Sequence, residues 1–127
     1  MSIKRWFVLS WLVSTGCLAG VKSIDVNKAA QLLNDTPDVF ILDARTQEEY
    51  QEEHLKGAIL IPFKEVSQHL NDLPSNKETV ILVYCTVGVR SSIATRTLQA
   101  QGYINTLNMR GGIEAWKKKG FQVHPSQ

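Results

Sequence analysis

The sequence predicts an α/β fold built on a parallel β-sheet, and two features of the chain support this. Strand-like apolar runs alternate with helical patterns, as they do in chains of right-handed β-α-β units. One of these runs, Val80–Tyr84, is uninterrupted and resembles a strand that is buried on both faces. With 127 residues, 43% of them hydrophobic and 20% charged, the chain has room for one globular domain.

The strands and helices can be assigned in chain order. Five strands are expected, at residues 23–25, 39–42, 58–61, 80–84 and 106–107. Turns are expected at residues 34–38, 54–57 and 111–112. Asp25 or Asn27 can cap the first helix, and Thr46–Glu49 has the form of a capping box for the second. The remaining helices are expected at residues 63–73, from Ser91 or Ser92 to a stop at Gly102, and at 113–119.

The strand at residues 80–84 leads directly into a candidate active loop, Cys85–Arg90. Cys85 sits at the carboxyl end of a central strand, and the loop after it runs into a helix. In open α/β sheets, ligands bind at the carboxyl ends of the strands. A cysteine that is merely a small buried apolar side chain is the structural alternative. The combination of strand end, loop and helix start favours a functional residue.

The loop is suited to hold a negative charge. Successive backbone N–H groups in a tight loop, together with the free N–H groups of a helix start, form a concavity for an anion. A thiolate is an anion, so the loop and the helix dipole both favour ionised Cys85. Arg90 adds a positive charge at the rim, and Gly88 allows the chain to turn. We therefore predict that Cys85 is a nucleophile.

The length of this loop separates two kinds of enzyme. Cysteine phosphatases carry a Cys-x5-Arg loop that wraps a tetrahedral phosphate, whereas the loop from Cys85 to Arg90 is one residue shorter. A shorter ring of amides encloses less volume, which suits a sulfur atom on the cysteine better than a phosphoryl group. In this loop the chain resembles the rhodanese family of sulfurtransferases. A small phosphatase or arsenate-handling enzyme on the same fold stays open as an alternative.

The resemblance to the rhodanese family extends over most of the chain, from residue 23 to residue 123. It is carried by segments in the family's order: Ile41–Arg45, Glu49–Tyr50, His54–Pro62, Tyr84–Ser91 and Met109–Trp116. The resemblance implies a five-stranded parallel sheet flanked by helices on both faces. Among family members, a single domain with an export signal is most similar to the small periplasmic thiosulfate sulfurtransferases.

For such an enzyme we expect double displacement through a persulfide on Cys85. The thiolate attacks the outer sulfur of thiosulfate or a similar small anionic donor, and a thiol or cyanide then removes that sulfur. The loop amides stabilise the terminal sulfur and Arg90 helps to bind the donor, so the substrate-binding residues are Thr86, Val87, Gly88, Val89, Arg90 and Ser91. No cofactor is expected. The alternative is a non-catalytic persulfide carrier or binding module that serves a partner protein.

Polar residues near the loop are expected to support it rather than to react. Asp43 and Arg45 follow a strand whose carboxyl end lies on the same side of the sheet as the loop. They can pair with each other, or Asp43 can accept N–H groups of the loop. A turn or capping hydrogen bond is expected for His54. We predict no metal site, because His69 and His124 lack partners at metal-ligand spacing.

The first 20 residues resemble a secretory signal peptide. Lys4 and Arg5 precede an apolar stretch, and the small residues Ala19 and Gly20 suit a cleavage site. The stretch is shorter than the roughly 20 residues that span a bilayer comfortably. We therefore expect an exported, periplasmic protein whose rhodanese domain covers residues 21–127. An uncleaved membrane anchor and a buried N-terminal helix are the alternatives.

Cys17 suggests a second form of export. Ser14–Cys17 resembles the lipobox of bacterial lipoproteins, in which the cysteine is lipidated, although Ser14 stands where that motif usually has an aliphatic residue. If Cys17 is cut away or lipidated, Cys85 is the one free cysteine of the mature domain and no internal disulfide forms. A membrane contact is then expected only through an uncleaved or lipidated N-terminus.

The charge of the chain argues against nucleic acid as a partner. The sequence has 14 Lys and Arg residues against 12 Asp and Glu residues, and the counts become equal without Lys4 and Arg5. The sequence has no basic patch and no basic stripe with interleaved aromatic residues. We expect a monomer whose partners are a small anionic sulfur donor and a thiol or cyanide acceptor.

Overall fold

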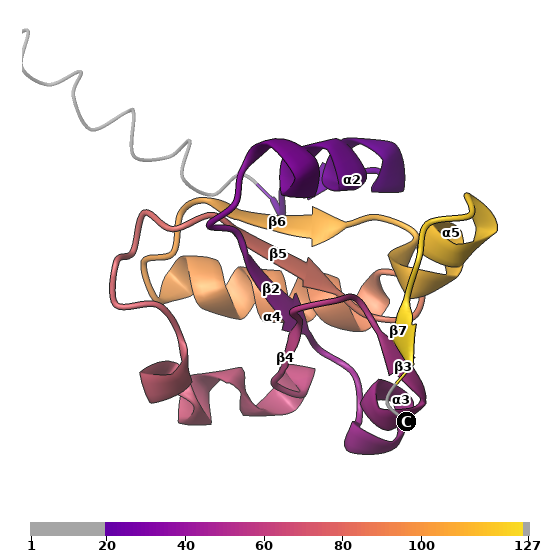
Figure 1. Ribbon diagram of the computed structural model, residues 1–127. Coiled ribbons are helices and arrows are strands. Elements are labelled where there is room, and N and C mark those ends of the chain that lie inside the picture. The colour runs from indigo at the N-terminus through magenta and orange to yellow at the C-terminus, as the bar shows by residue number, and fades with distance from the viewer. Residues whose placement is uncertain (1–19, 126–127) are drawn as a thin grey trace, which may run out of the picture.

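A five-stranded sheet forms the centre of the computed structural model (Figure 1). Its strand order is β1 (Ser23–Ile24), β6 (Thr106–Met109), β5 (Ile81–Tyr84), β2 (Phe40–Asp43) and β4 (Ile59–Leu60). Every neighbouring pair of strands is parallel. The predicted five-stranded parallel sheet is confirmed, and its middle strand, β5, is the one that leads into the active loop.

The structure describes residues 20–125. Apart from Gly20, the signal peptide predicted for residues 1–20 lies outside the described residues, as does the lipidation site predicted at Cys17, and both stay predictions. Within residues 20–125, no helix is long and apolar enough to cross a membrane.

Helices cover both faces of the sheet, as predicted (Figure 1). One face is covered by α2 (Val26–Asp35) and α5 (Gly112–Lys118). The other is covered by α4 (Val89–Ala100) and by two 3-10 segments, Phe63–Gln68 and Leu70–Asp72. The sheet therefore separates two hydrophobic cores, and each core lies between the sheet and its own helices.

The middle strand contributes to both cores, because successive side chains of a strand point to opposite faces. Ile81 and Val83 pack in the core that contains Leu98 of α4. Leu82 and Tyr84 pack in the core formed with α2 and α5. All four side chains are fully buried. The prediction of a strand buried on both faces is confirmed.

Two predicted helix caps are present. Asp25 caps α2, because its carboxylate accepts a hydrogen bond of 2.8 Å from the N–H of Lys28. Helix α3 (Gln47–Glu52) begins with the predicted capping box. Thr46 Oγ1 accepts from the N–H of Glu49, and the Glu49 carboxylate accepts from the N–H of Thr46. The box holds the Glu49 side chain, which has further contacts at the active loop.

The helix predicted at residues 63–73 is instead two 3-10 segments. The apolar residues Phe63, Val66, Leu70 and Leu73 are three, four and three residues apart, which is the spacing that predicts an α-helix. The two segments instead meet at His69, whose φ of −119° and ψ of 33° are not helical, and neither segment has a side-chain cap at its start. The segment packs Val66 and Leu73 into the core beside α4.

Helix α4 begins at Val89, earlier than the predicted start at Ser91 or Ser92. Gly88 is the cap, with a left-handed φ of +105° and no side chain to mark the boundary. The last residues of the Cys85–Arg90 loop are therefore the first residues of the helix.

A second, two-stranded sheet lies beside the main one (Figure 1). Here β3 (Glu53–His54) pairs antiparallel with β7 (His124–Pro125). The turn predicted at residues 54–57 is therefore shorter, at residues 56–57. Strands of two residues are too short to show the alternation that identifies a strand, so the sequence does not predict this pairing.

Candidate active site

Three hydrogen-bond donors surround the sulfur of Cys85. The N–H groups of Gly88 and Ser91 lie 3.1 and 3.3 Å from Sγ, and the Ser91 hydroxyl lies 3.3 Å from it. Cys85 is only 1% exposed, so its sulfur lies inside the loop. The structure thus brings backbone amides of the predicted loop to the predicted nucleophile.

These donors favour the ionised form of Cys85. Burial alone would raise the pKa of the thiol, because it removes water from the charged form. The hydroxyl of Ser91 and the backbone N–H groups of Ser91, Gly88 and Val87 outweigh burial, and the pKa lies below its usual value. A lower pKa increases the fraction of thiolate, which is the nucleophilic form.

The start of α5 supports the active loop through backbone hydrogen bonds. The N–H of Ile113 donates to the Cys85 carbonyl at 2.9 Å, and the N–H of Glu114 donates to the Thr86 carbonyl at 3.1 Å. This close approach requires glycine at position 112, where a Cβ would lie 2.3 Å from the Thr86 carbonyl oxygen. The sequence predicts only a turn here, since contact with a distant loop leaves no local pattern.

The guanidinium of Arg90 is held by Glu49 of α3. Its Nη1 and Nη2 donate to the two carboxylate oxygens at 2.9 and 3.1 Å, and Nη2 also donates to Thr86 Oγ1 at 2.8 Å. The hydrogen bond from Arg90 lowers the pKa of Glu49 to about 2, and Glu49 raises the pKa of Arg90. The cation predicted to bind the donor is therefore paired with a carboxylate for which the local sequence predicts helix capping and no contact with the loop.

Asp43 and Arg45 form a buried ion pair at the carboxyl end of β2. Arg45 Nη2 donates to Asp43 Oδ2 at 2.7 Å, and Nε donates to Oδ1 at 2.9 Å. The two side chains are 0% and 5% exposed, for Asp43 and Arg45 respectively. Burial alone would lower the pKa of Arg45, but the hydrogen bond and charge of Asp43 outweigh it and raise that pKa. Of the two predicted arrangements, the structure shows the pairing of Asp43 with Arg45.

Tyr84 connects this ion pair to the strand that carries the nucleophile. Its hydroxyl donates to Asp43 Oδ2 at 2.6 Å and accepts from the N–H of Leu55 at 3.0 Å. Burial, together with the charge of Asp43, raises the pKa of Tyr84 far above its usual value, so the hydroxyl stays protonated. Through this hydrogen bond the buried ion pair anchors the end of β5 at Tyr84, the residue directly before Cys85.

Asn108 of β6 is a site residue that the sequence does not reveal. Its Oδ1 lies 2.5 Å from the hydroxyl of Ser91, and its Nδ2 donates to the Gly88 carbonyl at 3.3 Å. The side chain is 5% exposed. Asn108 reaches the active loop because β6 lies next to β5, and strand adjacency is not written in the local sequence.

Two of the histidines form local contacts outside the active loop. His54 Nδ1 lies 2.9 Å from the Tyr50 carbonyl, and its ring stacks on Tyr50 at 3.9 Å. His69 lies on the surface against Glu65 and Asp72. Within residues 20–125, no group of three or more His, Cys, Asp or Glu side chains could hold a metal ion.

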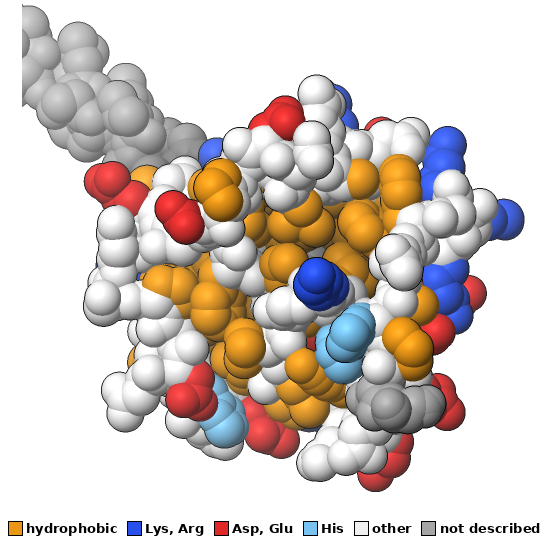
Figure 2. All heavy atoms as spheres, in the orientation of Figure 1, with side chains coloured by type: hydrophobic (Ala, Val, Ile, Leu, Met, Phe, Trp, Pro, Cys, Tyr) orange, Lys and Arg blue, Asp and Glu red, His pale blue; other side chains and the backbone are white. Residues whose placement is uncertain are grey.

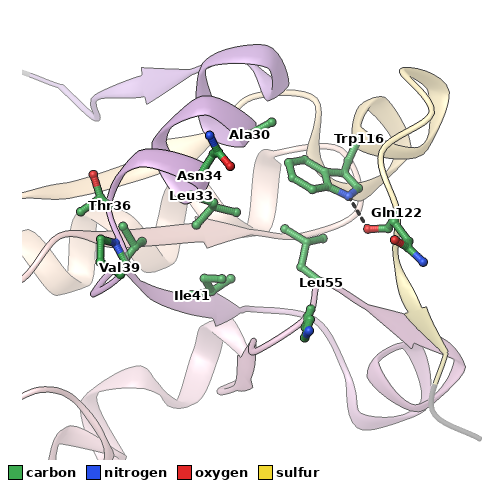
Figure 3. A pocket seen from close by; sticks show the side chains of 11 residues that line it. Ala30, Leu33, Asn34, Thr36, Val39, Ile41, Leu55, Trp116 and Gln122 are labelled. Atoms are coloured by element: carbon green, nitrogen blue, oxygen red, sulfur yellow. Dashed lines mark hydrogen bonds between the residues drawn. The ribbon is translucent and has the colours of Figure 1, made fainter.

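The face covered by α2 and α5 carries a shallow hollow of about 400 Å³ (Figures 2 and 3). Its floor is apolar and includes Leu33, Ile41 and Leu55, and Trp116 closes one end (Figure 3). Figure 2 shows apolar side chains gathered over the middle of this face. Lys56 is the one charged residue of the lining, which contains no cysteine, histidine or carboxylate. The hollow therefore offers no thiol, imidazole or carboxyl group that could act as a nucleophile or as an acid or base.

Residues 25–119 match the family model of the rhodanese-like domain. This range contains the active loop and all the residues described around it, and it leaves out the predicted signal peptide.

Curated relatives show the same similarity. A sulfurtransferase of Allochromatium vinosum is 36% identical over 103 residues, which cover 81% of this chain and 94% of that protein. The thiosulfate sulfurtransferase PspE of Escherichia coli is 39% identical over 70 residues, or 55% of this chain and 67% of PspE. The putative sulfur carrier protein YrkF of Bacillus subtilis is 33% identical over 80% of this chain, which spans only 54% of YrkF.

Solved structures share the fold. A rhodanese-like domain protein of Staphylococcus aureus is 31% identical, with a TM-score of 0.72 over 84% of this chain and 100% of that one. A thiosulfate sulfurtransferase of Pseudomonas aeruginosa is 30% identical, with a TM-score of 0.75. That match covers 84% of this chain but only 21% of the Pseudomonas chain.

Proposed function

The chain belongs to the rhodanese-like family of sulfurtransferases, and we propose that it moves sulfane sulfur from thiosulfate to a thiol or cyanide through a persulfide on Cys85. The observation that carries the proposal is the set of three donors within 3.3 Å of the buried sulfur. A buried thiol with these neighbours is favoured as a thiolate, and a thiolate is what the first step requires. The name of the relative PspE supports thiosulfate as the donor.

The first half-reaction loads the enzyme with sulfur. The Cys85 thiolate attacks the outer sulfur of thiosulfate, and a new S–S bond forms as the bond to the sulfite sulfur breaks. Sulfite leaves with the electron pair of that bond. The terminal sulfur on Cys85 then carries the negative charge, which the loop amides stabilise in the way an oxyanion hole stabilises oxygen.

The second half-reaction returns the enzyme to its starting state. Cyanide attacks the terminal sulfur and leaves as thiocyanate, or an acceptor thiolate attacks it and leaves as a persulfide. In either case Cys85 receives the electron pair and is again a thiolate. No general base is needed at either step, and the kinetics are those of a ping-pong reaction.

The direct test is thiocyanate formation from thiosulfate and cyanide by the folded, reduced domain. The wild type should be active, and Cys85→Ser should be inactive although it folds. A folded wild type without activity would remove thiosulfate as the donor. Equal activity in both proteins would remove Cys85 as the nucleophile.

A persulfide carrier that serves a partner protein is a second candidate, and the surface beside the loop favours it. Val87 and Val89 of the loop are 58% and 65% exposed, and Ile93 of α4 is 46% exposed. Apolar side chains so close to a reactive sulfur suit a protein surface better than a small dianion. The name of the relative YrkF points in the same direction.

The carrier and the catalyst differ in what happens to the loaded sulfur. For a carrier, the wild type should gain the mass of one sulfur atom from a persulfide donor and release it to cyanide slowly. The double variant Val87→Ser with Val89→Ser should then lose sulfur transfer to the partner protein, while the persulfide on its Cys85 still forms. Rapid turnover with thiosulfate and cyanide would favour the catalyst.

We also propose that the protein is exported to the periplasm and functions there as a monomer. The basic and apolar character of residues 1–20 supports export, and Cys17 marks the position of a lipid if one is attached. The intact mass of the exported protein distinguishes cleavage near Ala19 from lipidation at Cys17. A mass equal to that of the full chain contradicts both.

A further inference from the structure

We propose that Asn108 is a positioning residue for the Ser91 hydroxyl, and that this hydroxyl changes its acceptor whenever the charge on the Cys85 sulfur changes. The role in sulfur transfer rests on the persulfide route proposed above. The structural basis is independent of that route and consists of the contacts around Ser91 and Asn108.

The neighbours of Asn108 determine the orientation of its amide. One end lies 3.3 Å from the carbonyl oxygen of Gly88, which can only accept a hydrogen bond, so this end is the NH2 group. The same group lies 3.4 Å from Ser23 Oγ. The carbonyl end therefore faces Ser91 Oγ at 2.5 Å. An amide oxygen carries no hydrogen, so the proton between these two oxygens belongs to Ser91.

The Ser91 hydroxyl has one proton and two acceptors within reach. Asn108 Oδ1 lies at 2.5 Å and Cys85 Sγ at 3.3 Å. Ser91 is fully buried, so bulk water does not offer a further partner. While the proton points to Asn108, the hydroxyl oxygen presents a lone pair to the sulfur. A protonated Cys85 can donate to that lone pair, whereas a thiolate is repelled by it.

The charge on Sγ differs between the two states of the proposed cycle. As a thiolate, Sγ carries the negative charge and attracts the proton of Ser91. In the persulfide the charge moves to the terminal sulfur, Sγ becomes neutral, and the hydroxyl returns to Asn108. The change is a rotation of the hydroxyl about the Cβ–Oγ bond, in which no covalent bond breaks and Ser91 keeps its proton.

Asn108 therefore competes with the thiolate for one hydrogen bond. It disfavours the free thiolate relative to both the thiol and the persulfide, which leave the hydroxyl free for Asn108. The consequence for the proposed reaction is a more basic and more nucleophilic thiolate, and a shift of the loading equilibrium toward the persulfide.

The test is the fraction of ionised Cys85, measured from the pH dependence of alkylation by iodoacetamide in the reduced protein. This readout needs no sulfur donor. Ser91→Ala should lower the thiolate fraction about tenfold below the pKa, the effect of one lost hydrogen bond to a charged group. Asn108→Ala should raise it, because the hydroxyl of Ser91 is then free to donate to the sulfur alone.

Three controls separate this effect from distortion of the loop. Ser23→Ala removes the other side chain that contacts the Asn108 amide and should leave the thiolate fraction unchanged. Asn108→Leu keeps most of the side-chain volume and should act in the same direction as Asn108→Ala. The double variant Ser91→Ala with Asn108→Ala should match Ser91→Ala, since Asn108 acts only through that hydroxyl. Thermal melting of each variant shows whether it is folded at the temperature of the assay.

The opposite sign overturns the inference. A lower thiolate fraction in both Asn108 variants means that the amide supports the thiolate rather than competing with it. A clear effect of Asn108→Ala in the Ser91→Ala background means that Asn108 acts by another route. If the predicted changes in alkylation occur but no thiocyanate forms, this inference stands and the thiosulfate reaction proposed above does not.

Discussion

Two arginine–carboxylate pairs lie near the active loop, and they differ in burial. The Asp43–Arg45 pair is almost completely buried, with side chains 0% and 5% exposed. The Glu49–Arg90 pair is partly exposed, at 33% and 29%. Both use several hydrogen bonds between guanidinium and carboxylate. The two pairs therefore contain the same chemical groups and differ in how far water reaches them.

The difference in burial indicates that the two pairs have different roles. A buried charge that loses its partner stays without water, so the Asp43–Arg45 pair is costly to break and suits a permanent support. A partly exposed pair gains little stability from its attraction, because water and salt screen it. Under the proposed function, the Glu49–Arg90 pair can therefore open so that Arg90 binds an anionic donor, whereas the Asp43–Arg45 pair stays closed.

The largest expected effect is on stability when the buried pair is broken. Asp43→Asn leaves the Arg45 guanidinium buried beside a neutral amide, and we expect a loss of about 3–5 kcal/mol in the free energy of unfolding. Chemical denaturation of the purified variant measures it. The matched control is Glu49→Gln, the same change in the exposed pair, which should cost less than about 1 kcal/mol. Equal losses in the two variants would contradict the comparison.

Tyr84→Phe should destabilise the domain by an intermediate amount. It removes the hydroxyl that donates to Asp43 and accepts from Leu55, so a buried N–H and a buried carboxylate oxygen both lose a partner. We expect a loss of about 1–3 kcal/mol, measured by chemical denaturation. Tyr103→Phe is the control, because its hydroxyl donates to the Pro74 carbonyl and does not contact the ion pair. A smaller loss for Tyr84→Phe than for Tyr103→Phe would mean that Tyr84 does not support Asp43.

The exposed pair should affect donor binding more than stability. Glu49→Gln removes the negative charge that competes for Arg90, and we expect the KM for thiosulfate to fall about fivefold, since the pair is worth up to about 1 kcal/mol. Arg90→Ala should raise that KM and weaken loading by thiosulfate more than transfer to the acceptor. Steady-state and single-turnover kinetics with thiosulfate and cyanide measure both.

Equal changes in the two half-reactions of Arg90→Ala would contradict a role for Arg90 in donor binding. A higher KM for thiosulfate in Glu49→Gln would show that Glu49 supports the donor-binding form of Arg90 rather than competing with the donor.

The smallest expected effect is a dependence of stability on pH. The pKa of Glu49 is about 2 in the folded chain, below its usual value of 4.5. A lowered carboxyl pKa adds stability above pH 4.5 that is lost as the pH falls from 4.5 to 2. Because the pair is one-third exposed, screening limits this contribution to less than about 1 kcal/mol. Unfolding of the wild type and of Glu49→Gln between these pH values should show a steeper loss in the wild type; parallel curves would contradict the shift.

Much of the fold could be predicted because its signals are local. The apolar run of β5 marks a strand buried on both faces, and Asp25 and Thr46 mark helix starts through caps within three residues. The boundaries at which the structure differs from the prediction have no such signal. Helix α4 starts at a glycine without a side-chain cap, and the β3–β7 pairing joins two strands of two residues each.

The active site could be predicted in part for the same reason. Cys85, the loop amides and Arg90 are neighbours in the chain, so their spacing and chemistry are visible in the sequence. Glu49 meets Arg90 across 41 residues, and Asn108 meets Ser91 across 17. These contacts depend on which helices and strands lie side by side. The residues next to Glu49 or Asn108 in the chain do not indicate which element each of them will contact.

The sequence by itself determined the parallel sheet, the position of Cys85 at the end of its middle strand, and the tight loop whose amides approach the sulfur. These follow from the period of the side chains and from the geometry of a short loop, both of which act over a few residues. Only the tertiary structure decided that Arg90 is paired with Glu49 and that the Ser91 hydroxyl lies between Asn108 and the sulfur. Burial and contact between distant residues are properties of the packed chain, and they determine which charges are held and which remain free to react.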